Sequence, residues 1–373
     1  MERVEVIVVG GGPAGATAAR LLARGGARVV LLEARPIPRP KLCGGGLTPK
    51  ALPYLAGTAS EAIERRIDRV ELAGSRLGSV HLHLPEAPIA MVERAPFDAA
   101  LVQAAAAEGA DVRDRWAVQD IDAGADGVTV RGPRGIVHGA VLLAADGDPS
   151  RIAQRLGIGG EPRRHALALE VDLPFAAGRR SDELQLRFGV RGGYAWYFPK
   201  GDHANVGILT WQPRRQPGLR DHLLGYVAEL GMAPSDGRIK GHWIPQALRR
   251  TSASRGRVLL IGDAAATGDP FFGEGISFAM ASAVLAANAV EAWASGNGPL
   301  DAYDAALRST LGPAMRRLTL VSALADRIPT ISVAALRFSG WARNEGIRAI
   351  VGRGAPFGLP DPTSFPGTTP GRS

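Results

Sequence analysis

The first 33 residues constrain the fold of this chain more than any other stretch, because they carry the complete pattern of a nucleotide-binding β-α-β unit. Residues 4–9 form an apolar, β-branched run that predicts a buried strand. The chain then reads Gly-Gly-Gly-Pro-Ala-Gly over residues 10–15 and continues as an Ala- and Leu-rich helical stretch to about Arg24. It returns to an apolar strand over 28–32 that ends at Glu33, which completes the unit.

Each element of the glycine-rich turn has a physical task. Gly10 permits the tight turn, Gly12 lets the backbone approach a pyrophosphate, and Gly15 lets the helix pack closely on the strand. The helix N-terminus supplies positive potential to the phosphates. The carboxylate of Glu33 lies where it would accept hydrogen bonds from the ribose of an adenosine. This motif alone does not separate NAD from FAD.

Composition excludes several classes of protein. The 373 residues suit one large or two closely joined domains. The net charge of +8 comes without a basic block interleaved with aromatic residues, so we expect no nucleic-acid partner. The single cysteine, Cys43, excludes a disulfide framework and a cysteine-rich metal site, and we expect no metal. The chain enters a strand without a signal peptide and has no run of 18 apolar residues, which predicts a cytoplasmic protein without a membrane span.

The order of the predicted elements indicates two interleaved domains. A helix over 94–108 and a buried strand over 141–145 continue the nucleotide domain, whereas the short strands between about 160 and 250 predict an inserted antiparallel sheet. The predicted boundaries are 1–75, 94–160 and 250–300 for the nucleotide-binding domain, 76–93 and 161–249 for the substrate-binding β-sheet domain, 301–353 for C-terminal helices and 354–373 for a disordered tail.

The segment after the strand at 257–261 indicates which nucleotide is bound. It reads Gly262-Asp263 and, further on, Gly-Glu-Gly-Ile over 273–276 at the start of a long helix. It resembles the FAD-binding family that includes aromatic-ring hydroxylases. That resemblance implies that Asp263 hydrogen-bonds the ribityl chain and that the 273–276 turn lays backbone N–H groups against the isoalloxazine. Fixed amide dipoles there would stabilise the negative charge of reduced flavin.

The same resemblance defines the fold and the cofactor site. It implies an α/β fold of the p-hydroxybenzoate-hydroxylase-like type, in which an FAD-binding Rossmann-like domain carries an inserted antiparallel β-sheet substrate domain and a C-terminal helical segment. Asp146-Gly147 resembles the second nucleotide motif of the family, and Arg94 matches its arginine near the cofactor. The predicted cofactor-binding residues are Gly10, Gly12, Pro13, Ala14, Gly15, Glu33, Ala34, Arg35, Cys43, Gly44, Gly45, Arg94, Asp146, Gly147, Gly262, Asp263, Pro270, Gly273, Glu274, Gly275 and Ile276.

Within that family the chain is most similar to the geranylgeranyl reductases, which use FAD to saturate double bonds of prenyl chains. The loop over 41–51 resembles their cysteine-plus-glycine loop, and the strand from Tyr194 to Pro199 resembles their Y-x-W-x-F-P strand. Hydroxylases more often carry a histidine and an asparagine where this chain has Ala266 and Ser277. Halogenases share a related strand whose first tryptophan is replaced by Tyr194 here.

The resemblance also indicates which residues would act on the substrate. Alkene saturation needs hydride from flavin N5 on one carbon and a proton on its neighbour. We assign Cys43, Tyr194 and Trp196 to the catalytic site, with Cys43 as the proton donor or as the group that shapes proton delivery. Tyr194, Trp196 and Phe198 would line the substrate channel, although packing in the core of the sheet is an equal interpretation of these aromatics.

Partners follow from what the sequence lacks and from its C-terminal part. No second G-x-G-x-x-G stands between a strand and a helix, so NADPH, NADH or a reduced carrier, such as an electron-donor protein, would have to bind transiently. Basic amphipathic helices over 310–353 could place the protein on the cytoplasmic membrane, where a prenyl lipid or other prenyl-chain molecule would be found, or could simply close the domain. An aromatic or polyketide monooxygenase, and a non-catalytic redox-sensing flavoprotein, remain the alternatives.

Overall fold

The computed structural model describes residues 2–55, 57–74, 78–175, 182–233, 238–327, 337–352 and 358–365. Its first layer is an eight-stranded sheet built around β1 (Glu2–Val9). β1 pairs in parallel with β11 (Gly135–Ala144) on one side and β2 (Val29–Leu32) on the other, so that Val6 faces both Val141 and Val29. The sheet order is β17 (Ser254–Arg255), β18 (Val258–Leu260), β11, β1, β2 and β8 (Asp111–Arg113), with β10 (Val128–Gly132) and β9 (Asp120–Ala123) added beside β11.

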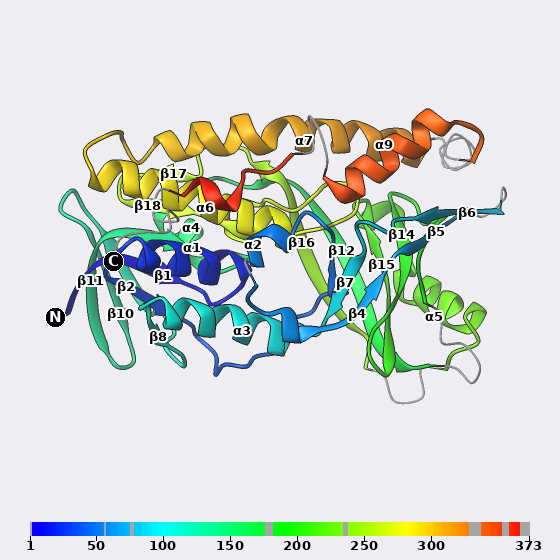
Figure 1. Cartoon of the computed structure of the whole chain (residues 1–373), viewed down its shortest axis with the longest axis horizontal. Helices are drawn as coiled ribbons and strands as arrows, with labels where there is room; N and C mark the ends of the chain where they lie inside the picture. Colours follow the sequence, from blue (N-terminus) through cyan, green and yellow to red (C-terminus); the bar gives the residue numbers. More distant parts are fainter. Residues whose placement is uncertain are drawn as a thin grey trace.

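Helices cover this sheet and complete the main core. α1 (Pro13–Arg24), α3 (Arg94–Ala107) and α6 (Ile276–Ala294) lie against it in Figure 1, and α4 (Arg151–Leu156) follows β11. The apolar side chains of β1, β2 and β11 that face the helices are almost fully buried, as the continuous apolar runs of a doubly covered parallel sheet require. α6 is long and apolar enough to cross a membrane, but 72% of it is buried in the fold, as in the core helix of a soluble protein.

The second layer is a seven-stranded sheet. Its order is β16 (Lys240–Arg249), β12 (Pro162–Pro174), β15 (His203–Thr210), β14 (Gly193–Pro199), β13 (Glu183–Phe188), β5 (Arg69–Gly74) and β6 (Gly78–His83). All pairs are antiparallel except β13 with β5. One face packs on α5 (Leu219–Glu229) through a separate apolar cluster that includes Tyr197 and Val206. The other face turns toward the first layer, as Figure 1 shows.

Smaller elements join the two layers. β3 (Gly46–Leu47), β7 (Ile89–Val92) and β4 (Ile63–Ile67) form a three-stranded sheet between them. The remaining elements are α2 (Leu52–Leu55), α7 (Ala302–Arg327), α9 (Gly340–Val351) and four 3-10 turns, at Ser60–Ala62, Pro213–Arg215, Gly262–Ala265 and Pro362–Ser364. α7 runs along the top of the molecule in Figure 1, above α6, and α9 follows it.

The structure corrects three predicted boundaries. Residues 69–74 belong to the substrate-side sheet because β5 pairs with β13, and residues 89–92 leave it because β7 pairs with β3 and β4. The segment predicted as a disordered tail contains an ordered part over 358–365, while residues 353–357 and 366–373 lie outside the described residues. Phe365 is 1% exposed and packs against Gly25 at the end of α1, which anchors this part.

Candidate active site

A cavity of about 1210 Å³ lies between the two layers and is lined from both. This volume exceeds the usual range for a single small ligand, roughly 300–1,000 Å³, so it can hold a large cofactor together with part of a substrate. The predicted cofactor-binding residues that line it are Gly10, Gly12, Pro13, Ala14, Glu33, Ala34, Arg35, Cys43, Gly44, Gly45, Arg94, Asp146, Gly147, Gly262, Asp263, Gly273, Glu274, Gly275 and Ile276.

Two of the predicted residues do not line the cavity. Gly15 is buried in the β1–α1 contact, where a Cβ atom would come within 1.9 Å of the Gly10 carbonyl oxygen. Its role is thus the helix-strand packing that the motif predicts. Pro270 does not line the cavity either, because its carbonyl oxygen faces the guanidinium of Arg164. Cofactor contact by Pro270 therefore stays a prediction.

The glycine-rich turn between β1 and α1 is shaped to receive a phosphate. Gly10 has a φ of +108°, and a Cβ atom there would lie 2.2 Å from the Ala145 carbonyl oxygen, so only glycine fits. The N-cap of α1 is Gly12, which has no side chain to cap the first N–H groups of the helix. These groups face the cavity and are suited to bind the pyrophosphate of a dinucleotide.

Charged side chains surround the acid that ends β2. Glu33 is 6% exposed, and its carboxylate accepts hydrogen bonds from the backbone N–H groups of Gly11 at 2.8 Å and Arg35 at 3.0 Å. Arg39 forms an ion pair with the same carboxylate at 3.0 Å and reaches Asp98 at 3.3 Å. Arg39 thus neutralises two carboxylates at the nucleotide end of the cavity.

The N-terminus of α6 lies across the same cavity. Asp263 lines the cavity, and its carboxylate accepts no hydrogen bond from any residue that the structure describes, so it remains available to a ribityl hydroxyl. A Cβ atom at Gly275, the N-cap of α6, would lie 3.6 Å from Asp263 Oδ1, which places the helix start beside this acid. The chemistry of these groups fits a flavin dinucleotide, whose pyrophosphate would bind at α1 and whose isoalloxazine would lie at α6.

The side chain of Glu274 is held by the protein itself. Lys50 Nζ lies 2.6 Å from its Oε2, and Thr48 Oγ1 donates to its Oε1 at 2.6 Å. Both charged side chains are almost fully buried. Glu274 therefore anchors the 41–51 loop to the turn before α6.

The second nucleotide motif supports the cavity through a helix cap. The Asp146 carboxylate accepts hydrogen bonds from Ser150 Oγ at 2.7 Å and from the backbone N–H of Ile152 at 3.1 Å. Burial raises the pKa of Asp146 despite these donors. Gly147, the next residue, has a φ of +83° with open space at its Cβ position, and it lines the cavity. Asp146 thus fixes the start of α4, and the backbone at Gly147 faces the ligand.

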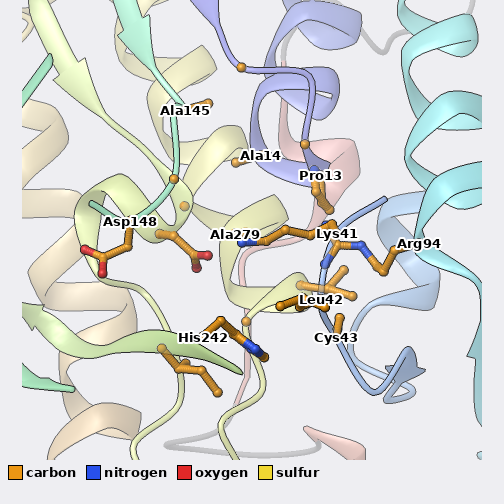
Figure 2. A pocket seen from close by; sticks show the side chains of 18 of the residues that line it. Pro13, Ala14, Lys41, Leu42, Cys43, Arg94, Ala145, Asp148, His242 and Ala279 are labelled. Atoms are coloured by element: carbon orange, nitrogen blue, oxygen red, sulfur yellow. The ribbon is translucent and has the colours of Figure 1, made fainter. Parts of the chain in front are cut away.

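The loop that carries Cys43 is held over the middle of the cavity. The backbone N–H of Gly45 donates to Cys43 Sγ at 3.4 Å, and the Arg94 guanidinium is a charged neighbour of the same side chain. Arg94 also pairs with Asp98 at 2.9 Å. Burial lowers the pKa of Arg94, but Asp98 and Cys43 outweigh this effect and hold it above its ordinary value. In Figure 2 the loop with Cys43 lies between Arg94 and His242.

The aromatic strand β14 presents alternate residues to opposite faces. Tyr194, Trp196 and Phe198 line the cavity, whereas Ala195 and Tyr197 pack on the α5 side. The Tyr194 hydroxyl donates to the Phe272 carbonyl oxygen, and Trp196 Nε1 donates to Asn205 Oδ1 at 2.8 Å. Burial raises the pKa of Tyr194. Because the Tyr194 hydroxyl and the Trp196 indole N–H are already hydrogen-bonded, both residues are suited to form the wall of the cavity.

The glycines of the loop and the aromatics of β14 fit one another. A Cβ atom at Gly44 would lie 2.8 Å from the Phe198 ring, and one at Gly45 would lie 2.1 Å from the Val92 carbonyl oxygen. Gly45 also has a φ of +77°, which favours glycine. The loop can therefore approach β14 closely only because its residues are glycines, and the structure brings these two predicted motifs together.

Glu170 and His242 are two of the cavity-lining residues that the sequence analysis did not predict. Glu170 on β12 is 4% exposed, and its Oε1 accepts a hydrogen bond from the Cys43 backbone N–H at 2.9 Å. His242 on β16 lies next to Lys41 and Arg94, and burial with these two charges lowers its pKa to about 4. Glu170 could have been found from the sequence, because it lies on the same face of a predicted strand as the apolar Ala166 and Ala168. His242 could not, because it lies in a strand that was not predicted.

Comparison with known proteins agrees with this geometry. Residues 3–187 match the FAD binding domain family. A digeranylgeranylglycerophospholipid reductase of Methanothrix thermoacetophila is 30% identical over 338 residues, which cover 84% of this chain and 85% of that protein. A menaquinone reductase of Mycolicibacterium smegmatis is 32% identical over 312 residues, or 76% of each chain.

Solved structures share the whole architecture. A geranylgeranyl bacteriochlorophyll reductase-like protein of Thermoplasma acidophilum is similar with a TM-score of 0.80 and 25% identity, covering 93% of this chain and 96% of its own. A flavin-dependent brominase, at 20% identity and a TM-score of 0.75, shows the same fold over 97% of both chains. FAD is the cofactor for which the cavity is built, and the protein is an FAD-dependent oxidoreductase. The chain belongs to the geranylgeranyl reductase family.

Proposed function

We propose that this oxidoreductase saturates carbon–carbon double bonds of a prenyl chain. The main support for this proposal is that one cavity combines a polar half with an apolar half. One half presents the helix N-termini of α1 and α6, and the other presents apolar side chains from the second sheet. This second half is lined by Val70, Leu184, Leu186, Tyr194, Trp196, Phe198, Leu209 and Phe272.

The apolar half is suited to hold isoprene units without a charged partner. Burial of one methylene contributes about 0.8 kcal/mol, so a five-carbon unit contributes roughly 3–4 kcal/mol before entropic losses. Leu186 and Trp196 pair directly across β13 and β14, which gives a continuous apolar wall. That wall excludes water from the place where the double bond would lie. FAD, once reduced, supplies the hydride.

Cys43 is the proposed source of the proton. It is the only thiol in the chain and lines the cavity between the two halves. The Gly45 N–H donates a hydrogen bond to its sulfur, and the positively charged Arg94 guanidinium is a neighbour of the same side chain. Tyr194 and Trp196, proposed as catalytic residues from the sequence, would act by shaping the substrate path.

The electron donor and the place of action are further parts of the proposal. NADPH, NADH or a reduced carrier protein would bind transiently to reduce the flavin. We propose that the protein is cytoplasmic and docks on the membrane through α7 and α9. Both elements carry exposed apolar residues, and Leu320 of α7 and Trp341 of α9 are more than 70% exposed. Flotation with anionic liposomes tests this contact, and a protein that stays at the bottom of the gradient contradicts it.

The reaction itself can be tested with defined prenyl compounds. The purified holoenzyme is reduced with dithionite without oxygen and incubated with geranylgeranyl diphosphate, a digeranylgeranylglycerophospholipid or menaquinone. Mass spectrometry should show a gain of two hydrogen atoms for each saturated bond. If all three probes come back unchanged while the flavin turns over with oxygen and inserts an oxygen atom into a substrate, the protein is a monooxygenase instead.

A matched pair of variants separates substrate binding from stability. Leu186→Gln places an amide in the apolar wall and should raise KM by about tenfold or more, since roughly 1.5–3 kcal/mol of burial is lost. Val206→Thr alters the opposite face of the same sheet, beside α5. It should lower stability and leave KM unchanged. Equal KM values for the two variants would contradict the placement of the prenyl chain.

A further inference from the structure

Glu170 is an acid set into the apolar wall of the cavity. It lies on β12, opposite Gly207 of β15, and Gly207 in turn lies opposite Trp196 of β14. A Cβ atom at Gly207 would lie 2.1 Å from the Trp196 indole, so the ring covers this glycine and extends over the neighbouring strand. Glu170 is thus 4% exposed, beside the aromatic wall.

Its two carboxylate oxygens differ in their surroundings. Oε1 accepts a hydrogen bond from the Cys43 backbone N–H at 2.9 Å, whereas Oε2 is buried and has no hydrogen-bond partner among the described residues. A buried oxygen without a partner is costly when it carries charge. A proton on Oε2 removes that cost, so the protonated acid is the form that this position favours.

Some of the groups around Glu170 raise its pKa and others lower it. Burial and the neighbouring Asp172 raise its pKa, while the Cys43 N–H, Lys200 and Lys240 lower it, and the result is a pKa of about 7. Lys240 lies opposite Glu170 on β16. A group that titrates near neutral pH can both release and recover a proton during turnover.

We propose that Glu170 is the proton reservoir for the Cys43 loop. This inference rests on the proposed function and extends it. Saturation of one double bond needs a hydride on one carbon, which reduced FAD would supply, and a proton on the other carbon, which the Cys43 thiol gives. The thiolate then takes the proton from Glu170, and Glu170 recovers one from solvent. The alkene is reduced and FAD is oxidised, with one proton consumed in all.

The test uses the one cysteine of the chain. Iodoacetamide alkylation of the holoenzyme reports the reactivity of Cys43 alone. The alkylation rate rises with pH because the thiolate is the form that reacts. In the wild type, Glu170 gains a negative charge near pH 7, which disfavours a second negative charge on the nearby Cys43. The alkylation rate should therefore rise less steeply above that pH. Glu170→Gln keeps an Oε1 acceptor for the Cys43 N–H and removes the ionisation. It should react about three- to tenfold faster than wild type above pH 8 and equally fast below pH 6.

A second variant should shift the pH at which the alkylation profile changes slope, without removing that change. Asp172→Asn takes away a charge that raises the pKa of Glu170, so the break in the alkylation profile should move to lower pH. Superimposable profiles for wild type, Glu170→Gln and Asp172→Asn would overturn the proposal. With geranylgeranyl diphosphate, Glu170→Gln should also lose tenfold or more in saturation rate at pH 8 while retaining its FAD. If the wild type saturates no prenyl probe, the proposed function fails, and the alkylation profiles still decide the role of Glu170.

Discussion

Breaking the buried ion pair between Lys50 and Glu274 should strongly destabilise the flavin site. The two charges are 2.6 Å apart, with side chains 3% and 7% exposed, and the Lys50 ammonium lies 5.0 Å from the Phe278 ring centroid. Lys50→Met leaves the Glu274 carboxylate buried with only hydroxyl donors from Thr48 and Ser277. Breaking a buried pair in this way costs about 3–5 kcal/mol.

Urea denaturation of the holoenzyme gives the free energy of unfolding for this comparison. Lys50→Met should lower it by about 3–5 kcal/mol, and the variant should release FAD more readily because the turn before α6 loses its anchor. The double variant Lys50→Met/Glu274→Gln should recover part of the loss. Arg131→Met removes a half-exposed partner of Asp120 and should cost at most about 1 kcal/mol. If Lys50→Met costs no more than Arg131→Met, the argument from burial is wrong.

Three further predictions follow from positions described by the structure. Gly10→Ala should abolish flavin absorbance because its Cβ would overlap a carbonyl at 2.2 Å, whereas Gly26→Ala, with positive φ but open space, should cost about 1 kcal/mol of strain and keep the flavin. A hydrogen bond to Glu93 raises the pKa of His203 to about 9, so the stabilisation by protonated His203 is complete below a pH of about 6.5 and is lost as the pH rises through 9. The urea midpoint of the wild type should therefore fall over that pH range. A His203→Gln variant whose midpoint falls equally steeply with pH would contradict this. Phe365→Ala should lower stability by about 3–5 kcal/mol, and an unchanged thermal midpoint would show that its segment adds nothing to the core.

The periodic parts of the fold were predictable because local sequence determines them. The unit over 4–33 and the α6 helix have continuous apolar patterns, and both lie where they were expected. The pairing of strands was harder to predict. β5 pairs with β13, which lies more than 100 residues later, and no local pattern specifies that contact. The short strand β8 ends at residue 113, because the chain turns soon afterwards at Arg115, whose φ is +51°.

The site was predictable where chemistry needs glycine or an acid at a fixed spacing. The turns at 10–15 and 273–276 carry that spacing, and both line the cavity. Glu170 and His242 could not be assigned because their neighbours come from distant parts of the chain. Glu170 acquires its surroundings from a loop 127 residues away. His242 lies in β16, a strand interrupted by Pro245 that the sequence did not mark clearly.

The packing of residues 358–365 on the first helix bears on how the protein is made. Tyr54 donates to the Pro360 carbonyl oxygen at 2.6 Å, and Phe365 closes over Gly25. The dinucleotide-binding unit is translated before this segment, yet its outer surface is completed by residues that lie more than 300 positions further along the chain. Ribosome-bound chains that stop short of this segment should therefore be poor at retaining flavin, so that cofactor capture waits for residues 358–365 to be made.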